Sequence, residues 1–205
     1  MAAFEAALDL GAGIECDLRL TADDRLVVFH DEDARRLCAS PLRIGRSKWK
    51  DLAGLRVGGH PIPTLETLLG LVGGRVPLLL ELKCDRDRRR WAPALSCALA
   101  GYRGRFGLMS FDPRLCRILR GEMPGVRRGL LLQDRLRTVE RHLAMGIAQP
   151  HFIGAEVPAL GKRWVEAARR SMPVYGWTVR TAAERAQAQV QADALIWEGD
   201  GRPRS

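Results

Sequence analysis

The chain has 205 residues, of which 46% are hydrophobic and 28% are charged. This balance is typical of a globular protein with a sizeable core, and it excludes an intrinsically disordered chain. The length fits one domain, because α/β barrels commonly occupy about 200 to 250 residues as a single unit. The formal net charge of +9 would suit an anionic small molecule, an anionic lipid or a nucleic acid.

Arginine supplies most of this charge, since only four of the 33 basic residues are lysine. The arginines are scattered along the chain, and the densest run, at 86–90, has no aromatic residues interleaved with it. Nucleic-acid sites usually combine basic and aromatic side chains, so we expect no nucleic-acid partner. A compositional bias toward arginine explains the charge more simply than a function does.

Five cysteines occur without any Cys-x-x-Cys pair, and their odd number favours free thiols in a reducing compartment. The first residues carry acids where a signal peptide needs a basic start. No apolar stretch reaches the roughly 18 to 20 residues that a membrane-spanning helix needs. The sequence therefore predicts a cytoplasmic protein without stable membrane insertion, and it leaves the oligomeric state open.

The first elements are a helix at 2–10, ended by two glycines, and a strand at 14–20 with strict alternation of apolar and polar residues. A turn then leads to a second short strand at 26–30, which we interpret as a hairpin return. A loop-rich stretch follows through His60.

The remainder alternates regularly between helices and apolar strands. The next helix opens at Pro63-Thr64, where Thr64 is a candidate cap, and closes at Gly73-Gly74. Further helices are predicted at 90–101, 113–121, 135–146, 161–171 and 181–190. The strands between them are predicted at 76–83, 106–111, 127–132, 151–157, 173–179 and 194–198.

Alternating strands and helices indicate a parallel sheet, and the core strands number seven once the hairpin return is set aside. A TIM-type (β/α)₈ barrel needs eight. Because the chain starts with a helix, we expect the first barrel strand to lie before Met1. Residues 1–198 are predicted to form one barrel domain, and residues 199–205 a disordered tail.

Glu15 and Asp17 are the first candidates for chemistry. Residues two apart in a strand share a face, so both carboxylates point one way while Cys16 points the other. Neighbouring carboxylates repel each other unless a cation sits between them or one is protonated. Divalent cations favour such oxygen ligands, and the alternative is a solvated strand edge.

Glu81 and Lys83 close the apolar run at 76–83, at the strand end where barrel enzymes place their chemistry. Unpaired charge is costly to bury, so both side chains need partners. Glu81 is a candidate third metal ligand, and Lys83 is a candidate for holding an anionic substrate oxygen. The alternative is an internal ion pair without a function.

His30 is the last residue of the strand predicted at 26–30, and an imidazole near a metal-bound phosphate suits general acid/base catalysis. The adjacent Asp31 is placed to orient it. The other three histidines, His60, His142 and His151, lack such a setting, and we interpret them as surface or packing residues. Trp177 is a candidate floor for a substrate pocket, although core packing explains it equally well. The same two interpretations apply to Phe111.

Taken in order, these segments resemble the glycerophosphodiester phosphodiesterases. The resemblance is densest over residues 2–83. The similar segments are AAFEAA at 2–7, GAGIECDLRLT at 11–21, VVFHD at 27–31, IPTLE at 62–66, LELK at 80–83 and GWTV at 176–179.

The resemblance implies a metal-dependent barrel that hydrolyses glycerophosphodiesters, which are small molecules, to glycerol phosphate and an alcohol. It also implies one divalent cation, Ca²⁺ or Mg²⁺, held by Glu15, Asp17 and Glu81. Lys83 corresponds to the family's lysine after the later glutamate, and His30 corresponds to one of two catalytic histidines.

The family normally opens with a His-Arg-Gly strand and a Pro-Glu-Asn turn, which have no counterpart in these 205 residues. The second catalytic histidine is therefore absent from them, and we expect impaired activity. Three alternatives stay open: a non-catalytic paralogue, a lysophospholipase D-like phosphodiesterase, and, with a poorer resemblance, a metal-dependent sugar-phosphate isomerase.

Overall fold

The structure is a computed structural model that describes residues 1–84 and 87–203. The chain divides into two compact units, which we describe one at a time. The first unit comprises residues 1–110 and 118–126, and the second comprises residues 111–117 and 127–205. The expected single domain over 1–198 stays a prediction.

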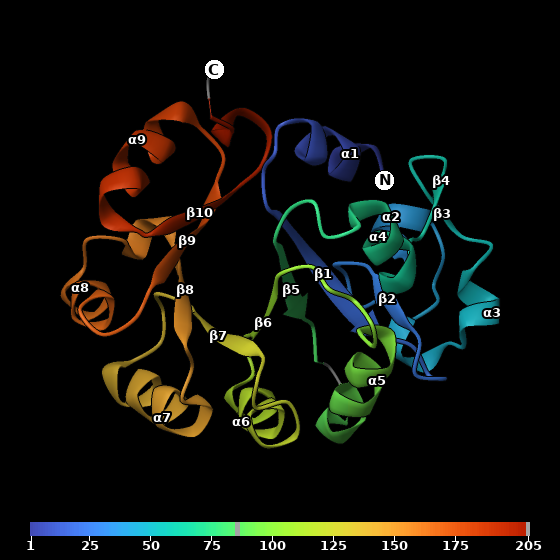
Figure 1. Ribbon diagram of the computed structural model, residues 1–205, viewed down its shortest axis with the longest axis horizontal. Coiled ribbons are helices and arrows are strands. Elements are labelled where there is room, and N and C mark those ends of the chain that lie inside the picture. The colour runs from blue at the N-terminus through green and yellow to red at the C-terminus, as the bar shows by residue number, and fades with distance from the viewer. Residues whose placement is uncertain (85–86, 204–205) are drawn as a thin grey trace. The chain divides into compact units, whose positions relative to one another are not determined.

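The first unit begins with helix α1 (Ala2–Asp9) and strand β1 (Ile14–Leu20), as the sequence predicts. Strand β2 (Leu26–Val28) pairs with β1 in the antiparallel sense, which confirms the hairpin return. Strands β5 (Leu78–Leu82) and β6 (Phe106–Ser110) complete a sheet in which β1, β5 and β6 run parallel, in the order β2-β1-β5-β6 (Figure 1).

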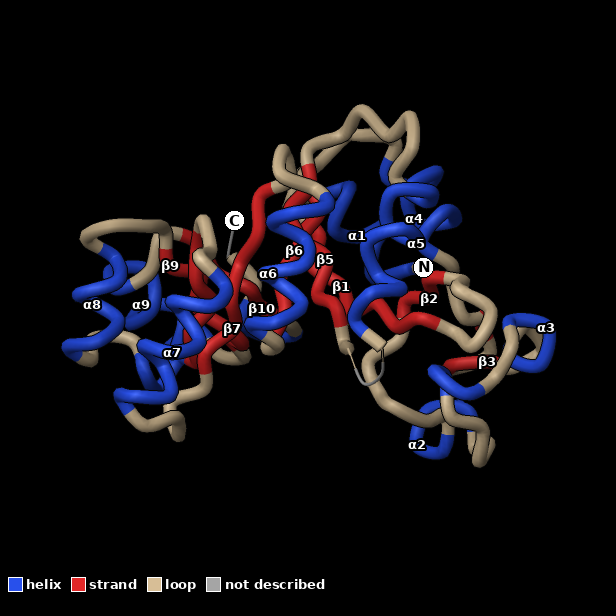
Figure 2. Tube along the Cα trace, turned by 90° about the horizontal axis from the view of Figure 1, so that it is seen from below, coloured by secondary structure: helices blue, strands red, loops and turns tan. Residues whose placement is uncertain are grey.

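The stretch expected to be loop-rich, 31–60, contains short elements that sequence pattern did not indicate. They are α2 (Arg35–Cys38), a 3₁₀ turn (Ile44–Arg46), α3 (Trp49–Leu52), β3 (Arg56–Val57) and β4 (His60–Pro61). Figure 2 shows α2 and α3 flanking β3. A small separate core built around Phe29, Ile44 and Leu52 holds these elements, because none is long enough to be stable alone.

One helix of the first unit follows its end signals. Helix α4 (Leu65–Val72) starts at Thr64, whose side chain accepts from the Thr67 N–H, and ends at Gly73 with φ of 55°. A left-handed residue of this kind favours glycine. The helix predicted at 90–101 is a 3₁₀ turn (Arg88–Arg90) followed by α5 (Trp91–Ala98). Helix α6 (Pro113–Glu122) contributes residues to both units.

The second unit repeats strand and helix. Its parallel strands are β7 (Arg127–Leu132), β8 (Phe152–Glu156), β9 (Val174–Val179) and β10 (Ala194–Trp197), hydrogen-bonded in that order. Its helices are α7 (Thr138–Ala148), α8 (Arg163–Arg169) and α9 (Ala182–Gln191). Alternate strand residues such as Leu130, Ile153 and Val174 pack with helix residues such as Val165 and Ala188 in one core.

The expected tail differs from the structure at its start. Gly199–Gly201 forms a 3₁₀ turn, and Gly201 is buried. The backbone N–H of Gly201 donates to Glu198, and the Arg185 guanidinium donates to the Gly201 carbonyl. The last two residues, 204 and 205, lie outside the described part of the chain.

Candidate metal and phosphodiester site

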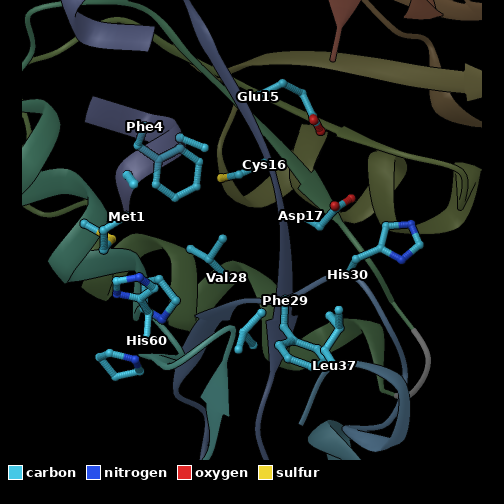
Figure 3. A pocket seen from close by; sticks show the side chains of 15 residues that line it. Met1, Phe4, Glu15, Cys16, Asp17, Val28, Phe29, His30, Leu37 and His60 are labelled. Carbon is cyan, nitrogen blue, oxygen red and sulfur yellow. The ribbon is translucent and has the colours of Figure 1, made fainter. Parts of the chain in front are cut away.

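The carboxylates of Glu15, Asp17 and Glu81 meet in the first unit. One oxygen from each lies within 4.8 Å of the others. Strict alternation places Glu15 and Asp17 on the same face of β1, and Figure 3 shows both side chains on one side of that strand and Cys16 on the other. Asp17 and Glu81 lie side by side because they are register partners across the parallel strands β1 and β5.

Lys83, just beyond β5, carries the positive charge of this cluster. Its Nζ lies 3.1 Å from Asp17 Oδ1 and is also paired with Glu81 Oε1. The backbone N–H of Lys83 donates to the Leu18 carbonyl at 3.0 Å, which extends the hydrogen bonding between β1 and β5 as far as Lys83. The internal ion pair considered from the sequence therefore exists, and it includes Asp17 as well.

Burial raises the pKa of the Glu81 carboxyl, against the opposing effect of the Lys83 ammonium. Burial alone would lower the pKa of Lys83, but the Glu81 and Asp17 carboxylates outweigh it and raise that pKa. Glu81 is only 7% exposed, so its charge is costly to desolvate unless a cation balances it. Lys83 pairs with both Asp17 and Glu81, so one ammonium faces two carboxylates.

This donor set fits a hard divalent cation, because it offers three carboxylate oxygens within 4.8 Å of one another. Glu15, Asp17 and Glu81 would hold such an ion.

His30 lies beside this cluster. A pocket of about 400 Å³ is lined by Glu15, Asp17 and His30 on one side of β1, and by residues such as Phe4 and Val28 on the other (Figure 3). The imidazole is 62% exposed, and its Nδ1 lies 2.8 Å from Asp31 Oδ1. An accessible imidazole beside a carboxylate cluster has the placement that proton transfer needs.

Trp177 belongs to the second unit, on β9, where its ring packs edge-on against Phe111 with ring centroids 5.4 Å apart. Its proposed contact with substrate stays a prediction. Among the remaining histidines, His60 also lines the pocket, whereas the sequence placed it with surface or packing residues. His151 accepts from the Arg128 N–H, and His142 bonds the Thr138 carbonyl within α7.

The sequence matches the family described as "Glycerophosphoryl diester phosphodiesterase family" over residues 1–198. The chain belongs to this family. A curated glycerophosphodiester phosphodiesterase of Caldanaerobacter subterraneus is 39% identical over 94 residues, which is 40% of this chain and 38% of that protein. The aligned segment thus spans little more than a third of this relative's length.

Solved structures of the glycerophosphodiester phosphodiesterase type share the fold. A putative glycerophosphoryl diester phosphodiesterase from Silicibacter pomeroyi has a TM-score of 0.87 and 21% identity, over 98% of this chain and 85% of that one. A phosphodiesterase from Oleispira antarctica, solved with the product sn-glycerol-3-phosphate, has a TM-score of 0.87 and 18% identity, over 98% and 87%. These neighbours confirm the predicted α/β class with parallel strands.

All five cysteines are free thiols. Within the described residues, no helix is both long and apolar enough to span a bilayer.

Proposed function

We propose that this chain hydrolyses glycerophosphodiesters to glycerol phosphate and an alcohol, with one divalent cation, Ca²⁺ or Mg²⁺, bound by Glu15, Asp17 and Glu81. The meeting of these three carboxylates within 4.8 Å carries the proposal. Membership of the family supports it, as does the bound glycerol phosphate product of the Oleispira antarctica neighbour.

A bound divalent cation would polarise the phosphoryl oxygen and stabilise the negative charge that develops on it. His30 is the proton-transfer residue, since its ring is accessible and lines the same pocket as Glu15 and Asp17. Lys83 supplies a fixed positive charge for a phosphate oxygen, and Trp177 is proposed to contact the glycerol or alcohol part of the substrate.

A single histidine leaves one half of the acid/base work unassigned. The His-Arg-Gly segment expected from the resemblance has no counterpart in the printed residues. We propose that a barrel strand carrying this segment, preceding α1, completes the site, and that the 205 residues alone turn over slowly. Loss of one acid/base partner lowers the reaction rate by about 10²- to 10⁴-fold.

Free thiols favour a cytoplasmic location.

Replacing Glu81 by glutamine tests the site. Glu81→Gln removes one ligand and its charge without changing the side-chain size, so Ca²⁺ and Mg²⁺ affinity measured by calorimetry should fall at least tenfold. Glu66→Gln is the matched control, because Glu66 is exposed on α4 and 3.9 Å from Arg25. Glycerol phosphate release from a panel of glycerophosphodiesters, measured with and without added cation, tests the reaction itself.

Equal cation affinity in the Glu81→Gln variant and the unsubstituted protein would rule out the metal site. Cation binding that is lost in the variant, combined with no hydrolysis of any diester by the unsubstituted chain, would point to a non-catalytic paralogue.

A further inference from the structure

The His30 side chain is anchored through one of its two ring nitrogens. Its Nδ1 lies 2.8 Å from Asp31 Oδ1, and the Asp31 side chain is only 19% exposed, against 62% for the imidazole. The backbone is fixed too, because the largely buried Arg19 donates from Nε to the His30 carbonyl at 2.9 Å. Nε2 is therefore the ring nitrogen available to a substrate.

Arg36, on α2, holds the Asp31 carboxylate in a two-point contact. Its Nε donates to Asp31 Oδ2 at 2.7 Å, and its Nη2 donates to Asp31 Oδ1 at 2.8 Å. A guanidinium fork of this kind fixes the plane of a carboxylate as well as its position. The Arg36 fork holds the pKa of Asp31 down at about 2, with a smaller contribution from His30. Asp31 is thus ionised at neutral pH and can only accept hydrogen bonds.

An acceptor at Nδ1 decides where the imidazole proton resides. When neutral, the ring carries one N–H, and an ionised carboxylate beside Nδ1 places that proton on Nδ1. The lone pair then lies on Nε2, which can take up a proton and return it.

We propose that Asp31 and Arg36 are positioning residues that fix the Nδ1–H tautomer of His30 and so reserve Nε2 for proton transfer. The inference deepens the proposed function and rests on it for the catalytic meaning of His30. The tautomer itself follows from the contacts of His30, Asp31 and Arg36 alone.

The neighbouring ion pair of Arg35 and Asp33 is a contact of the same helix that does not involve His30. Arg35, also on α2, lies 3.7 Å from Asp33, its side chain is 73% exposed, and none of its described contacts reaches the His30 ring. Arg35→Ala therefore removes an arginine from the same helix without affecting the histidine, which makes it the matched control for Arg36→Ala.

The Asp31→Asn variant distinguishes a role in orienting the His30 ring from a role in stabilising the loop alone. When the asparagine oxygen takes the Oδ2 position and accepts from Arg36 Nε, its NH₂ group takes the Oδ1 position, where it faces His30 Nδ1 and Arg36 Nη2. A donor at that place favours the Nε2–H tautomer, while the size of the side chain is kept. A comparable Asp-to-Asn change in the Ser-His-Asp triad keeps the geometry but leaves the wrong tautomer, at a cost of about 10⁴-fold in kcat.

The experiment is nitrogen NMR of the protein with ¹⁵N-labelled histidine at a pH where the rings are neutral. Of the four histidines, the His30 signals are identified as those lost in His30→Asn. We expect mainly the Nδ1–H form in the unsubstituted protein and in Arg35→Ala, and a larger share of the Nε2–H form in Asp31→Asn and in Arg36→Ala. Circular dichroism melting confirms that each variant is folded, and Arg36→Ala carries the test if Asp31→Asn is not.

A His30 tautomer that is the same in the unsubstituted protein, Asp31→Asn and Arg36→Ala would overturn the proposal. With a hydrolysable diester, Asp31→Asn should lower kcat by about 10²- to 10⁴-fold and leave KM nearly unchanged. A shifted tautomer with unchanged kcat would refute the catalytic meaning. If the unsubstituted chain hydrolyses nothing, the proposed function fails while the tautomer measurement still decides this inference.

Discussion

Lys83 Nζ lies 3.1 Å from Asp17 Oδ1, so the ammonium group that we assign to substrate binding also neutralises a proposed metal ligand. The same nitrogen pairs with Glu81, which is 7% exposed. One lysine thus stabilises two neighbouring carboxylates in a setting where little water reaches them. A cation bound by these carboxylates would balance some of the same negative charge as Lys83 does.

Lys83→Met should destabilise the cation-free protein by about 2–4 kcal/mol, because it leaves two close carboxylates without their shared counter-charge. Added Ca²⁺ should then raise the melting temperature of the variant by more than that of the unsubstituted protein, since the cation replaces the missing charge. Differential scanning calorimetry with and without Ca²⁺ measures both effects. Lys50→Met, which removes an exposed lysine, is the control. Equal Ca²⁺ shifts in the two proteins would contradict the shared role.

Arg36→Ala should raise the pKa of Asp31 from about 2 toward its ordinary value of 3.8, because the Arg36 hydrogen bonds are the largest cause of the shift. Carbon NMR of the Asp31 carboxyl during an acid titration measures it directly. Since the folded-state value lies below the unfolded one, this contact stabilises the fold fully above pH 3.8, and the effect is lost as the pH falls through about 2.

The stability difference between the unsubstituted protein and Arg36→Ala should therefore be larger at pH 6 than at pH 2, as measured by urea unfolding. Arg35→Ala should give a smaller difference at pH 6, because its contact with Asp33 is longer and more exposed. An Asp31 pKa that does not move on removal of Arg36 would show that another group lowers it.

The parts of the fold with strong local patterns could be predicted from the sequence. Strands β1 and β7 have the predicted bounds, because apolar and polar residues alternate strictly along β1 and a run of leucines at 130–132 ends β7. The elements between 31 and 60 could not be predicted, since they are two to four residues long. Packing around Phe29 and Ile44 holds them in place.

The candidate site also has a part that could be predicted from the sequence and a part that could not. Alternation in β1 predicts that Glu15 and Asp17 share a face. The pairing of Asp17 with Glu81 depends on the register between two strands that are distant in sequence, which the amino-acid pattern does not specify. Before the structure was known, the resemblance to the phosphodiesterases alone joined Glu81 to the pair. The amino-acid pattern did not indicate the Arg36–Asp31 contact, because this contact depends on how the segment after His30 folds into α2.

Arg90 joins the segment after β5 to the turn between β1 and β2. Its guanidinium pairs with Asp24 and donates to the carbonyl oxygens of Thr21 and Ala22 at 2.9 and 3.0 Å. Arg90→Ala removes these hydrogen bonds and should lower the free energy of unfolding by about 1–3 kcal/mol. Urea unfolding measures the change, and Arg89→Ala, at an exposed position of the same turn, should shift it by less than about 0.5 kcal/mol. Equal effects of the two substitutions would show that Arg90 is not a specific clamp.

Gly201 allows the segment after β10 to pack closely on β9. A Cβ added there would lie 2.0 Å from the Val179 carbonyl oxygen, which is backbone and cannot turn away. Gly201→Ala should therefore destabilise the protein by about 1–3 kcal/mol, as overpacked substitutions do.

Gly146→Ala should have the opposite effect on stability, because Gly146 lies within α7 and an added Cβ meets nothing within 4 Å. Alanine there should stabilise the protein by about 0.5–1 kcal/mol through the lower entropy of its unfolded chain. Thermal unfolding of both variants tests the pair. A Gly201→Ala protein as stable as the unsubstituted one would show that residues 199–201 are not held against β9 in solution, as the sequence-based expectation of a disordered tail would require.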